Sequence, residues 1–356
     1  MPFSAQNIID AGKIGLDYYI KNAPPEDNVA IERPLFKALR ERQKSAPGAK
    51  QYIVEQIRMS YGGALQWYRG SGVVTYNTRQ SIEQAQFPWQ SAHDGLTLDE
   101  DRLAQNGIAM TDDDDRKGTK SSEDEQIQLT NLIEEQSEIL VSGFKEGLSK
   151  AVHLDGTQAT DSIVGLDALL TMAAAPVGAG TQVVGGIDVF TFPLWRNQVY
   201  TGNVLATLID NMEKGSRLAA ANGGGITHYF AGGNFIDLFR NATKQGTEVQ
   251  RFVTIQPSGG TKMDPGITGL NFKGIPIVYC PEWETNFSGS VAPTISWNNR
   301  CYGLNLKHIR LRPLDNQDMV SRKPVRPANQ YVAYMALTWK GGMTINNRRS
   351  NAVFSV

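Results

Sequence analysis

The chain has 356 residues, which is enough to bury a large core and to form more than one lobe. Its 35 basic and 36 acidic side chains leave a net charge of −1, which excludes roles that depend on a strong overall charge. No apolar run approaches the ~20 residues of a membrane span, and the start MPFSAQNIID lacks the pattern of a signal peptide. We therefore expect a protein without a membrane partner that is made and kept in a cytosol.

The even charge balance hides two oppositely charged regions. Residues 94–138 carry fourteen acidic and four basic side chains, whereas residues 300–356 carry ten basic and two acidic ones. Opposed regions of this kind suit self-association of a near-neutral protein. Two solvated faces that never meet would have the same composition, so charge alone leaves both interpretations open.

Residues 1–50 are predicted to form an arm. A short helix is possible over residues 4–22 and another over 33–44, where Pro34 falls in the first turn. Paired prolines in APPEDN (23–28) and the run SAPGAK (45–50) interrupt the two segments. The apolar residues are too few for an independent core, so the arm must lie along another part of the molecule or along a neighbour.

Residues 51–110 favour a long β-hairpin. Strand-like runs begin at 52, 64, 73 and 84, and the turn Gly70-Ser-Gly72 separates the two arms. Isolated hairpins are marginal in water, and this one is rich in aromatic residues. These side chains pack either on the chain's own core or on another subunit. The candidate contact residues of the hairpin are Trp67, Tyr68, Arg69, Tyr76, Phe87 and Trp89.

A polar linker, TDDDDRKGTKSSEDE (111–125), leads into a single long helix at residues 122–151. The Asp run does not follow the alternating ligand pattern of a Ca²⁺-binding loop, so a solvated linker is expected. In the helix, acidic residues occupy the first turn and lysines the last, as the helix dipole favours. One apolar stripe recurs at spacings of three and four. Its members are Leu129, Leu132, Ile133, Ile139, Leu140, Phe144, Leu148 and Ala151.

The rest of the chain predicts a mixed α/β lobe followed by returning strands. A helix is expected over 203–221 with Asn203 as its N-cap, then a strand at 226–231 and a helix from 232. Short strands alternate with Gly and Pro turns between 252 and 279. Residues 331–346 predict two strands joined by a tight turn at Gly341-Gly342.

No motif predicts catalysis, a cofactor or a metal. The four histidines lie far apart without a cysteine or carboxylate at metal-ligand spacing, and no Gly-x-Ser-x-Gly elbow occurs. The segment PSGGTK (257–262) lacks the frame of a phosphate-binding loop. Cys280 and Cys301 lie in strand-like runs and are expected to be buried thiols. We expect a protein that is not an enzyme and holds no cofactor.

Taken in order, these elements resemble the major capsid protein of tailed bacteriophages, whose fold is shared with encapsulin shells and the herpesvirus capsid floor. The resemblance rests on the helix at 122–151, on Leu154-Asp-Gly156 and Gly165-Leu166, and on the final strands ending Ala352-Val-Phe354. Residues 331–354 also resemble the closing strands of one branch of that family.

The resemblance implies an α+β fold with a defined layout. Residues 1–50 would be the N-terminal arm, 51–110 the extended β-hairpin loop, and 111–154 the linker and spine helix of a peripheral domain. Residues 155–305 would form an axial domain around fivefold and quasi-sixfold axes. Residues 306–356 would return as strands to the peripheral domain.

The resemblance also implies a function and partners. The chain would self-assemble through hexamers and pentamers into an icosahedral capsid around a double-stranded DNA genome, in the virion, after assembly in the host cytoplasm. Other partners would be a scaffolding protein, a portal and a cement protein. Packaged DNA would meet the inner face without sequence specificity; Lys37, Arg40, Arg42 and Lys44 could touch phosphate or simply form a basic helix face.

Some capsid proteins of this family join hairpin lysines to asparagines of a neighbour. No Lys occurs between Gln51 and Arg116, so a shell held without such bonds is expected. Another self-assembling component, such as an encapsulin-like compartment shell or a tail or decoration protein, is the alternative.

Overall fold

The structure is a computed structural model that describes residues 31–48, 50–76, 78, 81–99, 123–173, 175–221, 223–245, 270–285, 295–322 and 332–356. The chain divides into two compact units. The first comprises residues 1–31, 92–148 and 317–339, and the second comprises 32–91, 149–316 and 340–356. The expected helix over 4–22, most of the linker at 111–125 and the expected strands before residue 270 lie outside the described residues.

The core of the second unit is a mixed six-stranded sheet in the order β6-β14-β10-β7-β9-β8. Strand β14 runs parallel to β6, and β7 runs parallel to β9, while the other neighbours are antiparallel. Every residue of the central strands β10 and β14 is buried, as expected for strands covered on both faces. The strands are β6 (Gln198–Tyr200), β7 (His228–Ala231), β8 (Asn271–Phe272), β9 (Ile275–Tyr279), β10 (Arg300–Leu304) and β14 (Ala352–Ser355).

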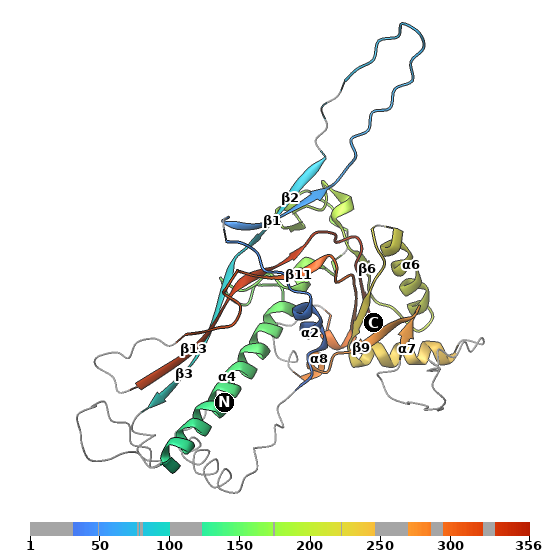
Figure 1. Ribbon diagram of the computed structural model, residues 1–356. Helices are drawn as coiled ribbons and strands as arrows, with labels where there is room; N and C mark the ends of the chain where they lie inside the picture. Colours follow the sequence, from blue (N-terminus) through green and yellow to red (C-terminus); the bar gives the residue numbers. More distant parts are fainter. Residues whose placement is uncertain are drawn as a thin grey trace, which may run out of the picture. The chain divides into compact units, whose positions relative to one another are not determined.

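Helices α6 (Leu208–Ala221) and α7 (Gly233–Gln245) lie beside this sheet and share its hydrophobic core (Figure 1). The buried residues of α6 include Leu208, Met212, Gly215 and Ala219, which recur at helical spacing. A Cβ on Gly215 would lie 2.8 Å from Cζ of Phe354, so glycine lets the helix approach β14 closely. The predicted α/β lobe is therefore present.

Asn203 is not the N-cap of α6, because the helix begins five residues later. Its side-chain amide donates to the carbonyl oxygens of Tyr200 and Ser355, at 2.9 and 2.8 Å, and its Oδ1 accepts from Asn211. The side chain therefore holds the loop before the helix against β14. The prediction failed because this contact joins residues 152 positions apart.

Two arginines of the basic C-terminal region are structural. Arg348 is fully buried and donates to the carbonyl oxygens of Leu169 and Trp195, at 2.7 and 2.9 Å. Burial lowers the pKa of this guanidinium to about 9. Arg300 is 2% exposed and forms an ion pair with Asp167 at 2.9 Å. Part of the positive charge of residues 300–356 is thus buried within the chain and is not on its surface.

The remaining elements of the second unit are short. A two-stranded ribbon pairs β1 with β2 and a second ribbon pairs β4 with β5. Residues 44–46 run along β11, where the amides of Lys44 and Ala46 donate to Leu311 and Pro313. These elements are α2 (Pro34–Glu41), β1 (Tyr52–Arg58), β2 (Ile82–Pro88), α5 (Leu166–Leu169), β4 (Val183–Val184), β5 (Ile187–Asp188), η1 (Pro193–Trp195), α8 (Glu282–Thr285), η3 (Trp297–Asn299) and β11 (Ile309–Pro313).

The first unit contains most of the long helix α4 (Glu123–His153), close to its predicted bounds. Phe144 and Leu148 are buried, as the apolar stripe predicts, whereas Ile139 is 57% exposed. Ile139 therefore does not belong to the buried face in the isolated chain. The unit also contains most of β3 (Gln90–Asp99) and all of β12 (Val320–Arg322), and both strands pair with β13 (Val332–Ile345).

Strand β13 corrects the prediction of two strands around Gly341-Gly342. It runs unbroken for 14 residues, and its last part pairs with β11 in the second unit. A Cβ on Gly342 would lie 2.7 Å from Cδ1 of Ile53 and 2.9 Å from the carbonyl oxygen of Pro88. The glycine is thus needed for close approach of the β1–β2 ribbon, as glycines inside strands often are, and does not mark a turn.

The final residues divide between two sheets. Strands β11 to β13 belong to a four-stranded sheet, but β14 is inserted between β6 and β10 in the six-stranded sheet. Residues 306–356, which were expected to return together, therefore contribute strands to two different sheets. Likewise, β3 pairs with β13 and not with the ribbon of β1 and β2, so the hairpin strands end at Pro88.

Candidate assembly interface

The hairpin is built on a short, well-paired base. Strands β1 and β2 pair antiparallel over seven positions, from Tyr52 opposite Pro88 to Arg58 opposite Ile82. Ile53 pairs with Phe87, and both are buried, whereas Tyr52 is exposed at the start of the ribbon. Alternation of buried and exposed residues gives this ribbon one face for its own chain and one face for solvent.

The buried face of the base is anchored on β4 and β5. The amide of Gln86 donates to the carbonyl oxygen of Gly185 at 2.9 Å. Gly185 has a φ of +62°, and a Cβ there would lie 3.1 Å from both Ala85 and Phe87. Backbone pairing and close packing together fix where the hairpin leaves the second unit.

A polar contact on the hairpin adds a second anchor. Glu55 of β1 accepts a hydrogen bond from Arg312 Nη2 at 2.6 Å and from Thr344 Oγ1 at 3.1 Å. Arg312 and Glu55 are each about one-sixth exposed or less, so water screens this ion pair less than a surface pair. The base is therefore joined to both β11 and β13.

Beyond the base the hairpin opens into a loop. All seventeen residues from 60 to 76 are exposed, and no strand is present at residues 59–76. The predicted turn at Gly70 is present, with the amide of Gly72 donating to Arg69, but the predicted flanking strands over 64–69 and 73–76 are not. Across the loop, the Thr75 amide donates to the Gln66 side chain at 3.0 Å.

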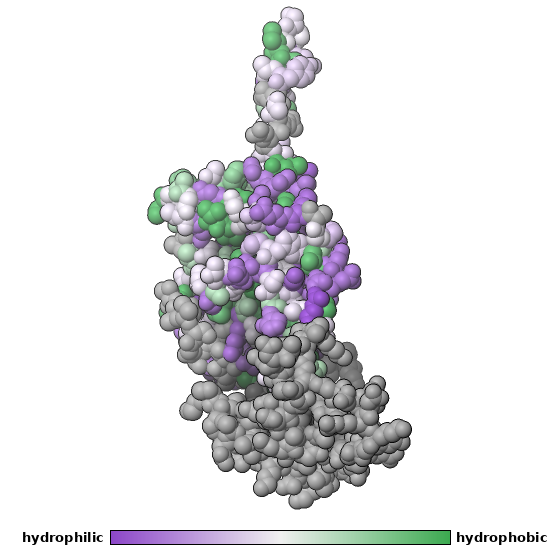
Figure 2. All heavy atoms as spheres, turned by 90° about the vertical axis from the view of Figure 1, so that its left-hand side faces the viewer, coloured by the Kyte–Doolittle hydropathy of each residue, from purple (hydrophilic) through white to green (hydrophobic). Residues whose placement is uncertain are grey.

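Large hydrophobic side chains are concentrated on this exposed loop. Trp67, Val73 and Tyr76 are more than nine-tenths exposed, and Figure 2 shows hydrophobic patches along the loop. Exposed apolar surface of this extent marks interaction sites in soluble proteins. The side chains concerned are Tyr61, Leu65, Trp67, Tyr68, Val73 and Tyr76, which we call the loop cluster.

The structure treats the six candidate contact residues differently. Trp67, Tyr68, Arg69 and Tyr76 are exposed on the loop and remain candidates. Phe87 does not, because it is 2% exposed and packs within its own chain. Trp89 is half-buried and its indole donates to the carbonyl oxygen of Lys50 at 3.0 Å, so it closes the foot of the hairpin.

Sequence reasoning missed three members of the loop cluster. Tyr61, Leu65 and Val73 were not among the candidates, although they lie in the same segment. We counted aromatic residues within the predicted strands, whereas Leu65 and Val73 are aliphatic and Tyr61 lies outside those strands. In a loop without strand pairing, residues that would face opposite sides of a strand are all exposed, and the strand pattern could not predict this.

One buried cluster has the residue types of a catalytic site. Ser149 Oγ donates to Glu282 at 2.9 Å, His153 Nδ1 lies 2.7 Å from the Ser149 carbonyl oxygen, and His153 Nε2 lies 3.4 Å from Glu282. The serine hydroxyl is thus directed at the carboxylate and not at the imidazole, which a nucleophile would require. All three residues are at most 1% exposed. The cluster joins α4 to α8 and is structural.

Within the described ranges, no group of three or more His, Cys, Asp or Glu side chains could hold a metal ion. Cys280 and Cys301 are both free and fully buried, as predicted. Burial raises the pKa of both thiols well above the usual value. No described helix combines the length and hydrophobicity needed to cross a bilayer.

Solved structures share this fold over nearly the whole chain. The capsid asymmetric unit of cyanophage A-1(L) aligns with a TM-score of 0.58 at 15% identity, covering 94% of this chain and 95% of that one. A structure from Gordonia phage Cozz aligns with a TM-score of 0.52 at 13% identity, covering 96% and 94%. The capsid of a native GTA particle aligns at 0.50 and 14%, covering 94% and 95%.

No protein-family model and no curated protein sequence matches the chain. The similarity to the solved structures is therefore one of fold, and it establishes the α+β capsid fold for this chain.

Proposed function

We propose that this chain is the shell-forming subunit of a phage-type capsid, which assembles through hexamers and pentamers into an icosahedral particle. The observation that carries the proposal is the loop cluster, which displays six large hydrophobic side chains on a segment rooted firmly in the second unit. Exposed apolar side chains contribute no stability to a monomer. A neighbour in a shell would bury it and gain the binding free energy.

The capsid fold of the solved structures supports the same proposal. The alignments cover 94–96% of the chain, so they extend over most of its helices and strands. In this proposal residues 155–305, with β14, surround the fivefold and quasi-sixfold axes, and α4 with β13 forms the peripheral region. The virion is the expected location, with assembly in the host cytoplasm, and the role is structural without enzymatic activity.

Several partners follow from the proposal. A scaffolding protein, a portal and a cement protein would act during or after assembly, and double-stranded DNA would fill the particle without sequence readout. The hairpin has no Lys between Gln51 and Arg116, so its contacts with neighbours are non-covalent. Denaturing electrophoresis of intact particles should show this chain only as a band at its subunit mass of 39.1 kDa, beside any bands of partner proteins. A ladder of multimers would contradict non-covalent assembly.

Electron microscopy of the purified chain tests the proposal directly. Closed particles, or rings of five and six subunits, are the expected result. Open tubes would favour a tail component. A chain that stays monomeric at high concentration, alone and with its co-expressed scaffolding protein, would overturn the proposal.

A further inference from the structure

A recess in the second unit is lined by positive charge. It has a volume of about 660 Å³, within the range of ligand sites in proteins. Arg42 and Lys44 follow α2, Lys307 lies in the turn between β10 and β11, and Arg310 lies on β11. The residues that line the recess include these four cations and no carboxylate. We call this recess the basic pocket.

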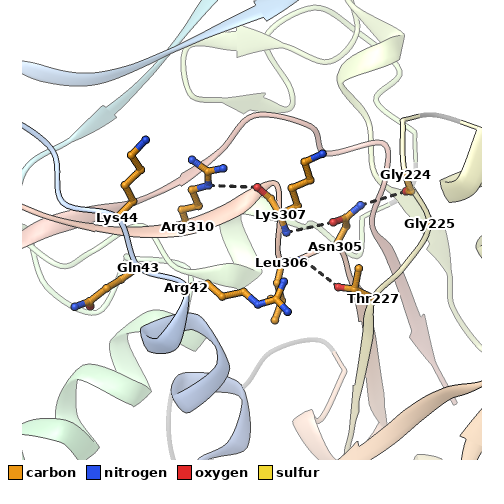
Figure 3. Close-up of a pocket in the computed structure, with 10 residues that line it drawn as sticks. All are labelled: Arg42, Gln43, Lys44, Gly224, Gly225, Thr227, Asn305, Leu306, Lys307 and Arg310. Atoms are coloured by element: carbon orange, nitrogen blue, oxygen red, sulfur yellow. Dashed lines mark hydrogen bonds between the residues drawn. The ribbon is translucent and has the colours of Figure 1, made fainter.

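The wall of the basic pocket is fixed by hydrogen bonds that do not use the lysine ammonium groups. Asn305 Nδ2 donates to the Gly224 carbonyl oxygen at 3.3 Å, and Thr227 Oγ1 donates to Leu304 at 3.1 Å. Arg310 Nε donates to the Lys307 carbonyl oxygen at 3.3 Å. In Figure 3 the side chains of Lys44, Lys307 and Arg310 extend to the same side. The backbone thus presents the cations on a rigid frame.

The four cations have no carboxylate partner among the described residues, whose ion pairs involve other side chains. The uncompensated positive charge also affects His228 nearby. Burial lowers the pKa of His228, and the positive charge of Arg42 lowers it further. Keeping four like charges together is unfavourable unless an anion joins them. The basic pocket is therefore matched to a ligand with several negative charges.

The chain itself has a segment of the required chemistry. Asp112 to Asp115 are four consecutive carboxylates within the acidic region, and Lys307 and Arg310 belong to the basic C-terminal region. A recess of this volume admits a few side chains of a peptide, whereas a DNA duplex would touch only its rim. Four carboxylates opposite four cations give matched charge, which favours the aspartate run over a nucleic acid.

We infer that the basic pocket binds the aspartate run 112–115 of a neighbouring copy of this chain. This inference rests on the proposed shell function, which places copies side by side. The contact joins two different surfaces, so it is heterologous, and contacts of this type close rings when the rotation fits. A ring of five or six subunits would use one such contact at each boundary.

Charge reversal in two places tests the inference. The pocket variant Lys44→Glu with Lys307→Glu changes two exposed lysines whose ammonium groups form no hydrogen bond or ion pair within the described residues. The run variant is Asp112→Lys with Asp114→Lys. Each alone should raise the concentration needed for half-maximal assembly by about tenfold, and less at high salt. The control Lys214→Glu with Lys340→Glu makes the same charge change at exposed lysines outside the pocket.

Two combinations identify the partner. Placing both reversals in one chain should restore assembly, because every boundary can then pair opposite charges. Mixing the two singly reversed chains in equal amounts should restore rings of six, in which the two chains can alternate, whereas a ring of five must keep one boundary of like charges. Rescue in one chain without rescue of the rings of six by mixing would mean that the run binds its own chain, and would overturn the inference. Unimpaired assembly of either reversed chain, or an equal loss in the control, would overturn it too.

Nuclease-treated preparations separate DNA from protein contacts. If the pocket variant assembles normally but its particles retain less DNA, the ligand is phosphate and the inference is wrong. Failure of the unaltered chain to form particles would instead refute the proposed function, so the two failures are distinguishable.

Discussion

The sharpest test of the loop cluster is truncation of Trp67. Its side chain is 93% exposed in the single chain, so Trp67→Ala should change the free energy of unfolding by less than ~0.5 kcal/mol. A Trp side chain offers about 200 Å² of surface. Burial of half of it against a neighbour, at ~25 cal/mol per Å², would contribute about 2.5 kcal/mol to each contact. That loss corresponds to a roughly 60-fold weaker contact.

Phe87 supplies the matched control from the same hairpin. It is 2% exposed, so Phe87→Ala should destabilise the subunit by about 3–5 kcal/mol. Urea unfolding of dissociated subunits measures the change in the free energy of unfolding, and light scattering at increasing subunit concentration measures assembly. If Trp67→Ala unfolds as readily as Phe87→Ala, or assembles as well as the unaltered chain, the loop cluster is not an interface.

Two further predictions concern the subunit itself. Burial lowers the pKa of His153 below its unfolded value near 6.5, although Glu282 and the Ser149 carbonyl partly oppose the shift. The stability that neutral His153 contributes is therefore complete above pH 6.5 and is lost as pH falls through the folded pKa. The urea midpoint should fall between pH 7.5 and pH 5 in the parent chain, and it should fall by less in His153→Gln. An equal fall in both chains would contradict this prediction. Gly215→Ala should destabilise by about 1–3 kcal/mol through its clash with Phe354, whereas Gly143→Ala in α4, where a Cβ meets nothing within 4 Å, should stabilise by about 0.5–1 kcal/mol. Thermal unfolding of both variants checks the opposite signs.

Local signals in the sequence predicted the local elements well. Helix α4 has both its dipole-matched charges and its apolar stripe within one continuous run, so its bounds were found within about two residues. The strand β7 and the helix α7 were found for the same reason, because each bears its pattern within a short segment. The base of the hairpin was also predicted, although its strands end earlier than expected.

The errors arose where a residue serves a distant part of the chain. Gly342 looks like a turn residue in sequence, but its missing side chain makes room for Ile53 and Pro88. Asn203 has the chemistry of a cap and is used to hold Ser355 instead. The basic pocket likewise brings together the segment after α2, the Gly224 turn and β11, and only the fold makes its cations neighbours.

The two buried thiols give this chain a built-in chemical reporter. Cys301 lies in β10 at the centre of the sheet, between Phe354 and Ala231, and Cys280 follows β9 with its amide donating to Ala231. Because both are fully buried with raised pKa values, an alkylating reagent can modify them only when the sheet opens. The rate of alkylation therefore measures the opening of this sheet in the free subunit, and would measure it in the proposed particle as well, without any added label.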